Sequence, residues 1–458
     1  MSGCLNIHRL ALCAILLLSG TYAHAQDVDP VTARHLQGIL DSIRVADGIQ
    51  GVAVGLHDPL RGEWSGVGGE SHAGTPISAD MVFGIASNTK TFVAVLLLRL
   101  QEEGLLSLDD PVATWLPPID GVDSTIQIRQ LLQHTSGIGD YASQPWYRDS
   151  IRADPQRHWR AEEILAMIGP PDFKPGTSWK YSNANYYLAG LIAEAATGHP
   201  VAALLRTHIL DPLGLDTTFL GAAEAPRGVI AHPWTAYADI SAMPRRSLLS
   251  GAWTAGAMYS TSGEMVRWYR GLMEGEIIDA ASLAQMTEFS GPVGYGLGLF
   301  QRRVSGRTVW GHSGSIIGYR SQMLYDVASG IVISVLVNQN TERICTHCIS
   351  DALLSALIEE VTGVDGIATA APATVTLHPA APNPVRDRMM VRFDISHPGA
   401  VQLELRDLPG RRVRTLCDGW KEAGSHRVDF RSADLSRGVY LLLLRQGTET
   451  RFRSIIVY

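Results

Sequence analysis

The sequence predicts an α+β protein followed by a small all-β module. Strand patterns form two groups, a hairpin at 51–68 and three strands after residue 306, which can pair in one antiparallel sheet flanked by helices. A mostly helical stretch from 105 to about 257 separates the two groups and predicts an all-helical lobe. From residue 375 the pattern changes to short alternating strands between Gly and Pro turns, which is typical of an immunoglobulin-like sandwich. The six strands expected there are 389–395, 401–407, 412–416, 426–430, 440–445 and 452–457.

The composition is that of a globular chain long enough for two or three domains. Of its 458 residues, 46% are hydrophobic and 18% are charged, so a large core is possible without metal or disulfide support. The net charge of −7 argues against a nucleic-acid partner. Because no His, Asp or Glu spacing supports a metal site, we expect neither a metal nor a cofactor.

Residues 1–25 predict a signal peptide. A weakly basic start precedes an apolar run at 10–18, and Ala-His-Ala at 23–25 fits the small-x-small cleavage rule. The apolar run is short for a membrane span, so an uncleaved anchor is the weaker alternative. We expect an exported mature protein that begins at Gln26 and is secreted or held at the cell surface, with the periplasm as the alternative location.

Local patterns predict each element of the part that follows, residues 26–362. Asp58, Pro59 and Gly62 supply the turn that joins the first two strands, and Gly104 suits the end of a helix. In order, the expected elements are helix 31–46, strands 51–57 and 63–68, helix 87–103, helix 126–133, helix 186–197, strands 307–311, 320–325 and 330–337, and helix 349–361.

Ser87 and Lys90 are the first candidate catalytic pair. They precede the apolar segment 92–100, so a helix would place both side chains on one face. A serine hydroxyl needs a neighbouring base, and a lysine can act as that base when burial discourages its ammonium form. The helix N-terminus would also offer N–H groups to an oxyanion. Since Ser-x-x-Lys is common by chance, a plain N-cap role for Ser87 is the alternative.

Tyr181 and Asn183 form a second candidate group where a loop meets the predicted helix 186–197. A phenol can act as a general base when nearby cations favour the phenolate, although Tyr181 could also be a packing residue. The amide of Asn183 can hold a substrate carbonyl or orient a lysine.

A third group, His312 to Ser315, lies between two predicted strands. Gly314 would let a ligand backbone approach closely, and an edge strand here could bind a peptide-like substrate by β-augmentation. A structural strand histidine is the alternative for His312. His134 precedes Thr135-Ser136-Gly137, and we expect it to be a turn residue rather than a catalyst.

Three cysteines remain after the predicted cleavage. Cys345 and Cys348 predict a local disulfide or two buried thiols, because a redox role would need a thioredoxin-like βαβ context and zinc would need two more ligands. The pairing of Cys417 is not determined by the sequence.

Three motifs in chain order carry groups suited to acyl transfer: Ser87-x-x-Lys90, Tyr181-x-Asn183 and His312-Ser313-Gly314. Together they resemble the serine β-lactamase and DD-peptidase superfamily, the penicillin-recognising enzymes. The Tyr-x-Asn form and the stretches 132–138 and 294–298 look like the class C β-lactamase and D-stereospecific peptidase or esterase branch. The resemblance covers about residues 27–362, and it implies an active site between the sheet and the helical lobe.

The resemblance also implies roles for these residues. Ser87 would be the acylated nucleophile, Lys90 and Tyr181 would share the proton transfers, and Asn183 would position the substrate. The backbone N–H groups of Ser87 and Ser315 would form the oxyanion hole. His312 departs from the family pattern, because β-lactamases carry a lysine at that position.

That departure bears on the substrate. A free imidazole titrates near pH ~6.5, so we expect His312 to be only partly charged at neutral pH and a poor holder of a substrate carboxylate. The sequence therefore favours a secreted amidase, esterase or D-amino-acid peptidase that forms an acyl-enzyme. A class C-type β-lactamase is the first alternative, and a surface binding protein that keeps the fold without chemistry is the second.

The tail has its own resemblance, at 381–384 (Ala-Pro-Asn-Pro), 438–441 and 455–457. These stretches resemble the C-terminal sorting domain of type IX secretion cargo, over roughly residues 375–458. The Ala-, Gly- and Pro-containing stretch 363–374 predicts a linker before it. The resemblance implies recognition by secretion machinery, followed by release or attachment to the cell surface. A spacer that stays with the enzyme is the alternative.

Overall fold

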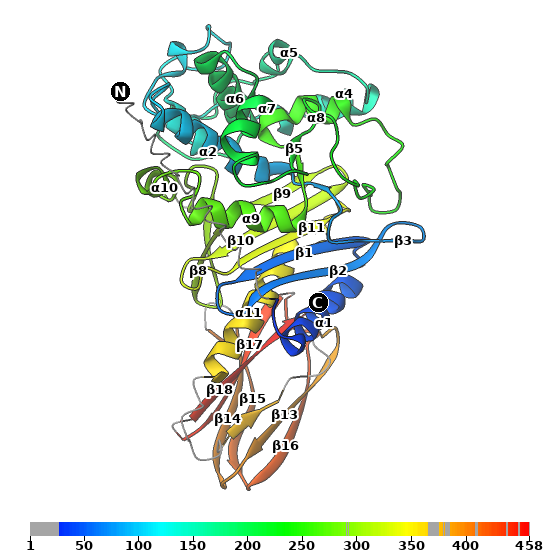
Figure 1. Cartoon of the computed structure of the whole chain (residues 1–458). Helices are drawn as coiled ribbons and strands as arrows, with labels where there is room; N and C mark the ends of the chain where they lie inside the picture. Colours follow the sequence, from blue (N-terminus) through cyan, green and yellow to red (C-terminus); the bar gives the residue numbers. More distant parts are fainter. Residues whose placement is uncertain are drawn as a thin grey trace, which may run out of the picture.

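The computed structural model describes residues 27–364, apart from 290 and 292, and residues 375–457, apart from 379, 381–384, 408–410, 437 and 448. The predicted signal peptide and most of the predicted linker lie outside the described residues. A helical lobe, a central sheet and a β-sandwich follow one another along the long axis of the molecule (Figure 1).

The central sheet joins the two predicted groups of strands. Hairpin strands β1 (Gly51–Asp58) and β2 (Gly62–His72) meet the later strands where β1 pairs antiparallel with β11 (Val332–Val337). The strand order is β3-β2-β1-β11-β10-β8-β7, and β9 pairs with β10 beside this path. The remaining strands are β3 (Thr75–Pro76), β7 (Phe300–Val304), β8 (Arg307–Gly311), β9 (Ser313–Ile316) and β10 (Tyr319–Asp326).

Helices cover both faces of this sheet. Helices α1 (Pro30–Asp47) and α11 (Thr346–Val364) lie on the side of the sandwich, and α9 (Ser262–Met273) lies on the side of the lobe (Figure 1). Strand β1 shows the alternation that this requires, because Val52 and Val54 pack with α1 and α11 whereas Ala53 packs into the core shared with the lobe.

The lobe is built around α2 (Thr89–Glu102), which is buried on nearly every side. A helix that is apolar all round belongs in a core, and this position fixes the start of α2 between the lobe and the sheet. The other lobe helices are α3 (Ile128–Leu132), α4 (Pro145–Ala153), α5 (Ala161–Leu165), α6 (Asn183–Thr197), α7 (Val201–Leu205), α8 (Arg246–Ala252) and α10 (Ala280–Met286). No single helix in the described ranges is long and apolar enough to cross a membrane, although the bent pair Asn183–Thr197 and Val201–Leu210 meets the length and composition test.

Two small sheets form the C-terminal module around a third apolar cluster, as the alternating pattern predicts. All six expected strands are present: β13 (Arg388–Ile395), β14 (Gly399–Asp407), β15 (Arg412–Lys421), β16 (Gly424–Arg431), β17 (Gly438–Gln446) and β18 (Glu449–Val457). A seventh strand, β12 (Val375–Leu377), was not expected. The Arg386 guanidinium donates to the Ala46 carbonyl over 2.8 Å, which links the module to α1. The domain boundaries given above stay predictions.

Candidate active site

Ser87 lies in a single 3₁₀ turn, η1 (Ala86–Asn88), directly before α2. Ala86 holds a left-handed φ of 49°, a conformation that is costly for a residue with a side chain and is often found at functional sites. The turn is fixed from both sides, since Asn88 donates to the Ser321 hydroxyl over 2.8 Å and Ile85 N–H donates to the Met258 carbonyl. Asn88, and not Ser87, is the N-cap of α2, so the N-cap interpretation of Ser87 is wrong.

Lys90 lies one turn further along, and its side chain is completely buried. Its Nζ donates to the Ala255 carbonyl over 2.7 Å and to the Asn183 Oδ1 over 2.9 Å, and it lies 3.4 Å from the Ser87 Oγ. Burial lowers the pKa of Lys90 to about 7, against a smaller opposite effect of the Asp140 charge. A large share of the Lys90 side chain is therefore neutral at neutral pH and can accept a proton from Ser87.

Tyr181 lies over the same amine. The Lys90 Nζ is 4.8 Å from the centre of the Tyr181 ring, and the phenol shares a hydrogen bond with the Ser87 side chain. Burial raises the pKa of Tyr181, and the bond to Ser87 opposes this only in part. The group is thus a phenol at neutral pH, which suits it to pass a proton on rather than to act as a phenolate base.

His134 supports this arrangement from behind. Its ring packs 4.2 Å from the ring of Tyr181, and its Nδ1 lies 3.0 Å from the Asn185 amide nitrogen and 3.3 Å from the Ser182 N–H. His134 has a positive φ of 60°, as in a tight turn. It occupies the structural turn position that the sequence predicts.

Asp140 is a site residue that the sequence analysis missed. Its carboxylate accepts the Asn183 backbone N–H over 2.9 Å and the Asn183 side-chain NH₂ over 3.3 and 3.4 Å. With the NH₂ group held there, the Asn183 oxygen faces Lys90. No local motif marks Asp140, because it lies in a loop 43 residues before its partner.

Strand β9 forms the opposite wall and presents an open edge. Met323 N–H donates to the His312 carbonyl over 2.9 Å, so His312 and Met323 are a hydrogen-bonded pair. Pairs alternate along an antiparallel ladder, which makes Ser315 and Arg320 a non-hydrogen-bonded pair. The N–H of Ser315 therefore points away from β10, as an oxyanion donor requires.

Gly314 allows β9 to touch the nucleophile turn. A Cβ added there would lie 2.3 Å from the Ile85 carbonyl oxygen and 2.3 Å from the Ser321 Oγ. The glycine therefore serves the protein's own backbone contact. It also lines the larger cavity, and the close approach of a ligand at this position stays a prediction.

His312 is neutral, which differs from the partial charge expected above. Burial, with a smaller effect of the Lys90 charge, lowers the pKa of His312 to about 3. Its Nδ1 lies 2.6 Å from the Ser313 carbonyl oxygen and so carries the proton, while its Nε2 lies 3.2 Å from the Tyr295 hydroxyl. The expectation rested on a free imidazole, and the ring is buried instead.

Two cavities meet at the nucleophile. Both are lined by Ser87, Asn183 and Ser315. The larger, of about 950 Å³, also includes Tyr181 and His312. The smaller, of about 460 Å³, extends under α4 and α8, and none of the three catalytic motifs contains the following lining residues: Tyr141, Tyr147, Arg148, Ile151, Arg152 and Leu248.

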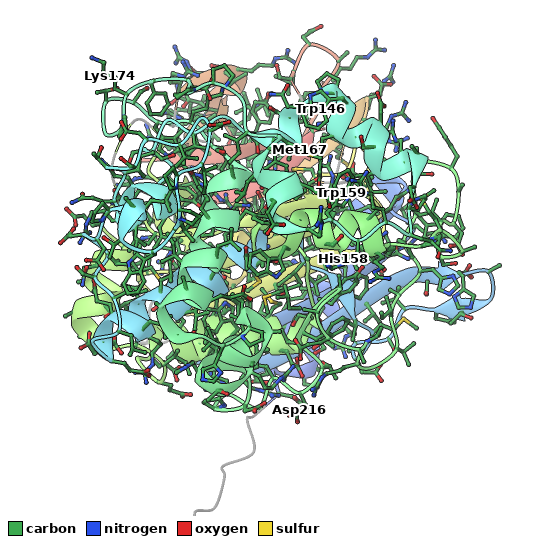
Figure 2. All side chains as sticks on the ribbon, turned by 90° about the horizontal axis from the view of Figure 1, so that it is seen from above. Trp146, His158, Trp159, Met167, Lys174 and Asp216 are labelled. Atoms are coloured by element: carbon green, nitrogen blue, oxygen red, sulfur yellow. A yellow bond between two sulfur atoms is a disulfide. The ribbon has the colours of Figure 1, made fainter. Side chains whose placement is uncertain are left out.

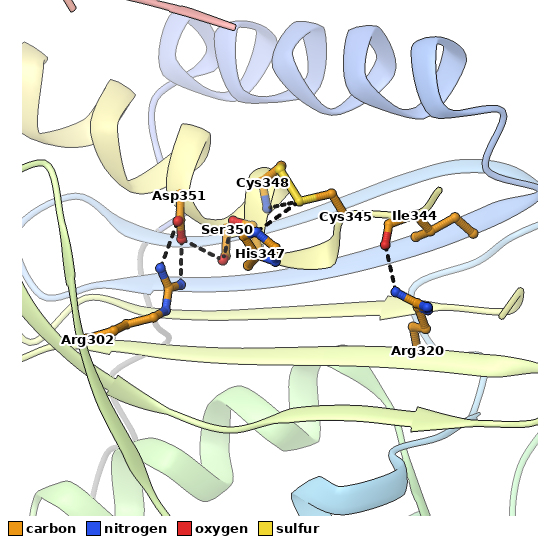
Figure 3. Close-up of a disulfide and its surroundings, with 8 residues drawn as sticks. All are labelled: Arg302, Arg320, Ile344, Cys345, His347, Cys348, Ser350 and Asp351. Carbon is orange, nitrogen blue, oxygen red and sulfur yellow. Dashed lines mark hydrogen bonds and ion pairs between the residues drawn. A yellow bond between two sulfur atoms is a disulfide. The ribbon is translucent and has the colours of Figure 1, made fainter. Parts of the chain in front are cut away.

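A disulfide closes one wall of the larger cavity. Cys345 and Cys348 are bonded at the start of α11, so the first of the two alternatives given above is the observed one (Figure 3). The donor atoms of Cys345, His347 and Cys348 lie within 4.8 Å of one another, but the disulfide uses both sulfurs. Arg320 fixes the preceding loop by donating to the Ile344 carbonyl over 2.9 Å (Figure 3). Cys417 is a free thiol.

Comparison with known proteins agrees with this geometry. Residues 32–345 match the family model described as Beta-lactamase, and residues 380–458 match the model of the secretion system C-terminal sorting domain. Because the first match covers more than half of the chain, the chain belongs to the beta-lactamase family of serine hydrolases. The sorting domain supports a secreted or cell-surface location.

Individual relatives include hydrolases of several kinds. Esterase EstB of Burkholderia gladioli is 35% identical over 36% of this chain and 44% of the esterase. Penicillin-binding protein 4 of Amycolatopsis lactamdurans is 29% identical over 78% of this chain and 96% of that protein. The crystal structure of a D-stereospecific amidohydrolase from Streptomyces sp. has a TM-score of 0.60 and 33% identity, over 67% of this chain and 94% of that one. The chain spans about half the length of several curated relatives.

Proposed function

We propose that this protein is an exported serine hydrolase that cleaves small amides or esters, D-amino-acid derivatives foremost, through an acyl-enzyme. The observation that carries the proposal is the position of Ser87 between the buried amine of Lys90 and the open edge of β9, at the meeting point of two cavities. The D-stereospecific amidohydrolase and the D-aminopeptidases among the relatives support the substrate class.

Acylation begins when the neutral Lys90 amine takes the proton of Ser87. The Ser87 Oγ then bonds to the substrate carbonyl carbon, and the negative charge moves to the carbonyl oxygen. The N–H groups of Ser87 and Ser315 bind this oxyanion, as preorganised donors do in acyl transfer.

Collapse of the tetrahedral intermediate breaks the bond to the leaving group. Tyr181, which lies beside both Ser87 and Lys90, passes the proton to that group as it departs. In deacylation, water loses a proton to the same groups and its oxygen attacks the ester carbon. The ester bond to Ser87 then breaks, the acid is released, and the proton returns to the Ser87 oxygen.

A penicillin-hydrolysing role receives less support. The position where β-lactamases carry a cation holds His312, which burial keeps neutral. Export rests on the predicted signal peptide at 1–25 together with the sorting domain, and we propose that the secretion machinery recognises the latter.

Labelling of Ser87 tests the proposal. Residues 26–458 are incubated with a fluorophosphonate and, separately, with a penicillin, and intact mass and a peptide map locate any adduct. We expect a fluorophosphonate adduct on Ser87 that the Ser87→Ala variant lacks. Rapid penicillin turnover would instead restore the β-lactamase alternative. Absence of any adduct on folded protein would favour the non-catalytic binding protein.

A further inference from the structure

We infer that the two cavities around Ser87 receive different halves of the substrate, a step that rests on the function proposed above. A leaving group needs a proton as it departs, so it must lie beside the proton donor. Tyr181 lines the larger cavity and is not among the residues that line the smaller one. The leaving group therefore occupies the larger cavity, and the acyl group extends from Ser87 into the smaller one under α4.

The lining of the smaller cavity combines buried apolar side chains with exposed arginines of α4. Tyr141, Tyr147 and Ile151 are buried and supply an aromatic and aliphatic surface. Further out, Arg148 and Arg152 line the same cavity from positions i and i+4 of α4, which is one face of that helix. Figure 2 looks down on this lobe and labels Trp146, two residues before Arg148.

The side chains of these two arginines are exposed and are not paired with their neighbours on α4. Within the described part of the chain, neither side chain forms a hydrogen bond or an ion pair, and Asp149 between them is not within ion-pair distance. By contrast, Arg157 of the same lobe pairs with Glu163 over 2.9 Å and stacks on the Trp159 ring.

The remaining charges of the cavity do not cancel the two arginines. Arg320, on the far wall, already donates to Asn340 and to the Ile344 carbonyl. Glu342 is the one acidic group among the residues that line this cavity, and it lies near Arg320. Three cations thus face one anion, and two of the cations lie together on α4.

We propose that Arg148 and Arg152 bind a carboxylate on the acyl portion of the substrate, so that the preferred substrates are amides or esters of acidic acyl groups. The apolar walls contact the carbon chain, and the arginine pair holds the anionic end. Guanidinium groups bind carboxylates with paired hydrogen bonds, which suits two arginines one helical turn apart.

A matched substrate pair tests this assignment. The p-nitroanilides of N-acetyl-D-glutamate and N-acetyl-D-glutamine differ in one charge at nearly constant size. We expect kcat/KM to favour the glutamate compound by about tenfold, the order of a hydrogen bond to a charged group. The double variant Arg148→Gln with Arg152→Gln should remove this preference, so that the ratio of the two kcat/KM values falls to about one. Arg34→Gln, which removes an exposed charge of α1 far from both cavities, should keep the preference.

A binding assay covers the case in which neither anilide is cleaved. N-acetyl-D-glutamate amide and N-acetyl-D-glutaminamide are compared as competitors of fluorophosphonate labelling at Ser87. Stronger protection by the acidic amide, lost in the double variant, supports the proposal. Equal behaviour of the two compounds, with Ser87 still labelled, overturns the carboxylate assignment and leaves the proposed hydrolase intact. Failure of Ser87 to label at all overturns both.

Discussion

Lys90 donates a hydrogen bond over 2.9 Å to the side-chain oxygen of Asn183, and this bond joins the first turn of α2 to the first turn of α6. The opposite end of the Asn183 amide is held by Asp140, so the direction of the bond is fixed. The amine of Lys90 is thereby oriented by two acceptors, Asn183 and the Ala255 carbonyl, and kept next to Ser87.

The first prediction concerns the pH dependence of acylation. Because the pKa of Lys90 is lowered to about 7, the amine loses its proton as the pH rises through that value and only then accepts the proton of Ser87. We expect the rate constant for fluorophosphonate labelling to rise with pH, with an apparent pKa near 7, and then to level off. A rate that stays flat from pH 6 to 8 would show that Lys90 is not the base.

The second prediction tests Asp140 as a positioning residue. Its negative charge raises the pKa of Lys90 against the larger effect of burial. Asp140→Asn should therefore move the acidic limb of the labelling profile to lower pH and reduce the plateau rate by about tenfold, since the Asn183 amide loses a charged partner. Asn183→Asp adds a charge beside Lys90 and should move the limb to higher pH. If the acidic limb of the labelling profile lies at the same pH in the wild type and in both variants, Asp140 has a merely structural role.

The difference between what the sequence predicted and what it missed follows the range of the interactions. Ser87 and Lys90 were predictable because one helical turn brings them together, and the strands of the tail because alternation is local. Asp140 and the Ala255 carbonyl carry no local pattern, since only the packing of separate loops places them at the amine.

The predicted partial charge of His312 was wrong for a similar reason. A motif shows which residue occupies the position but not how deeply it is buried, and only 2% of this residue is exposed. Its hydrogen bond with Tyr295, 17 residues earlier, likewise depends on the folded sheet. Burial decides the protonation state here, and the sequence carries little direct information about burial at a single position.

The third prediction links Lys90 to stability. Its pKa in the folded state, about 7, lies below the ordinary value of 10.5, so the unfolded chain binds more protons between these two values. The contribution of Lys90 to the free energy of unfolding therefore becomes more favourable to the folded state as the pH rises across that window. We expect that the free energy of unfolding of the wild type, measured in urea, increases relative to that of Lys90→Met between pH 7 and pH 10. Lys174→Met, which removes an exposed lysine, is the control. If the difference in unfolding free energy between wild type and variant changes with pH in the same way for Lys90→Met and Lys174→Met, the prediction is contradicted.

The fourth prediction concerns the contact between β9 and the nucleophile turn. In Gly314→Ala the new methyl group would meet the Ile85 carbonyl and the Ser321 hydroxyl at 2.3 Å, and neither the backbone oxygen nor the hydroxyl, which donates to that same carbonyl, can easily move. We expect a loss of about 1–3 kcal/mol in the free energy of unfolding, as for other overpacked sites, together with much slower labelling of Ser87. Gly263→Ala is the matched control, because an added Cβ in that first turn of α9 meets nothing within 4 Å and should be neutral or slightly stabilising. If Gly314→Ala labels as fast as the wild type, the close approach of β9 does not set the geometry of the nucleophile, and the oxyanion role of the Ser315 N–H loses its structural basis.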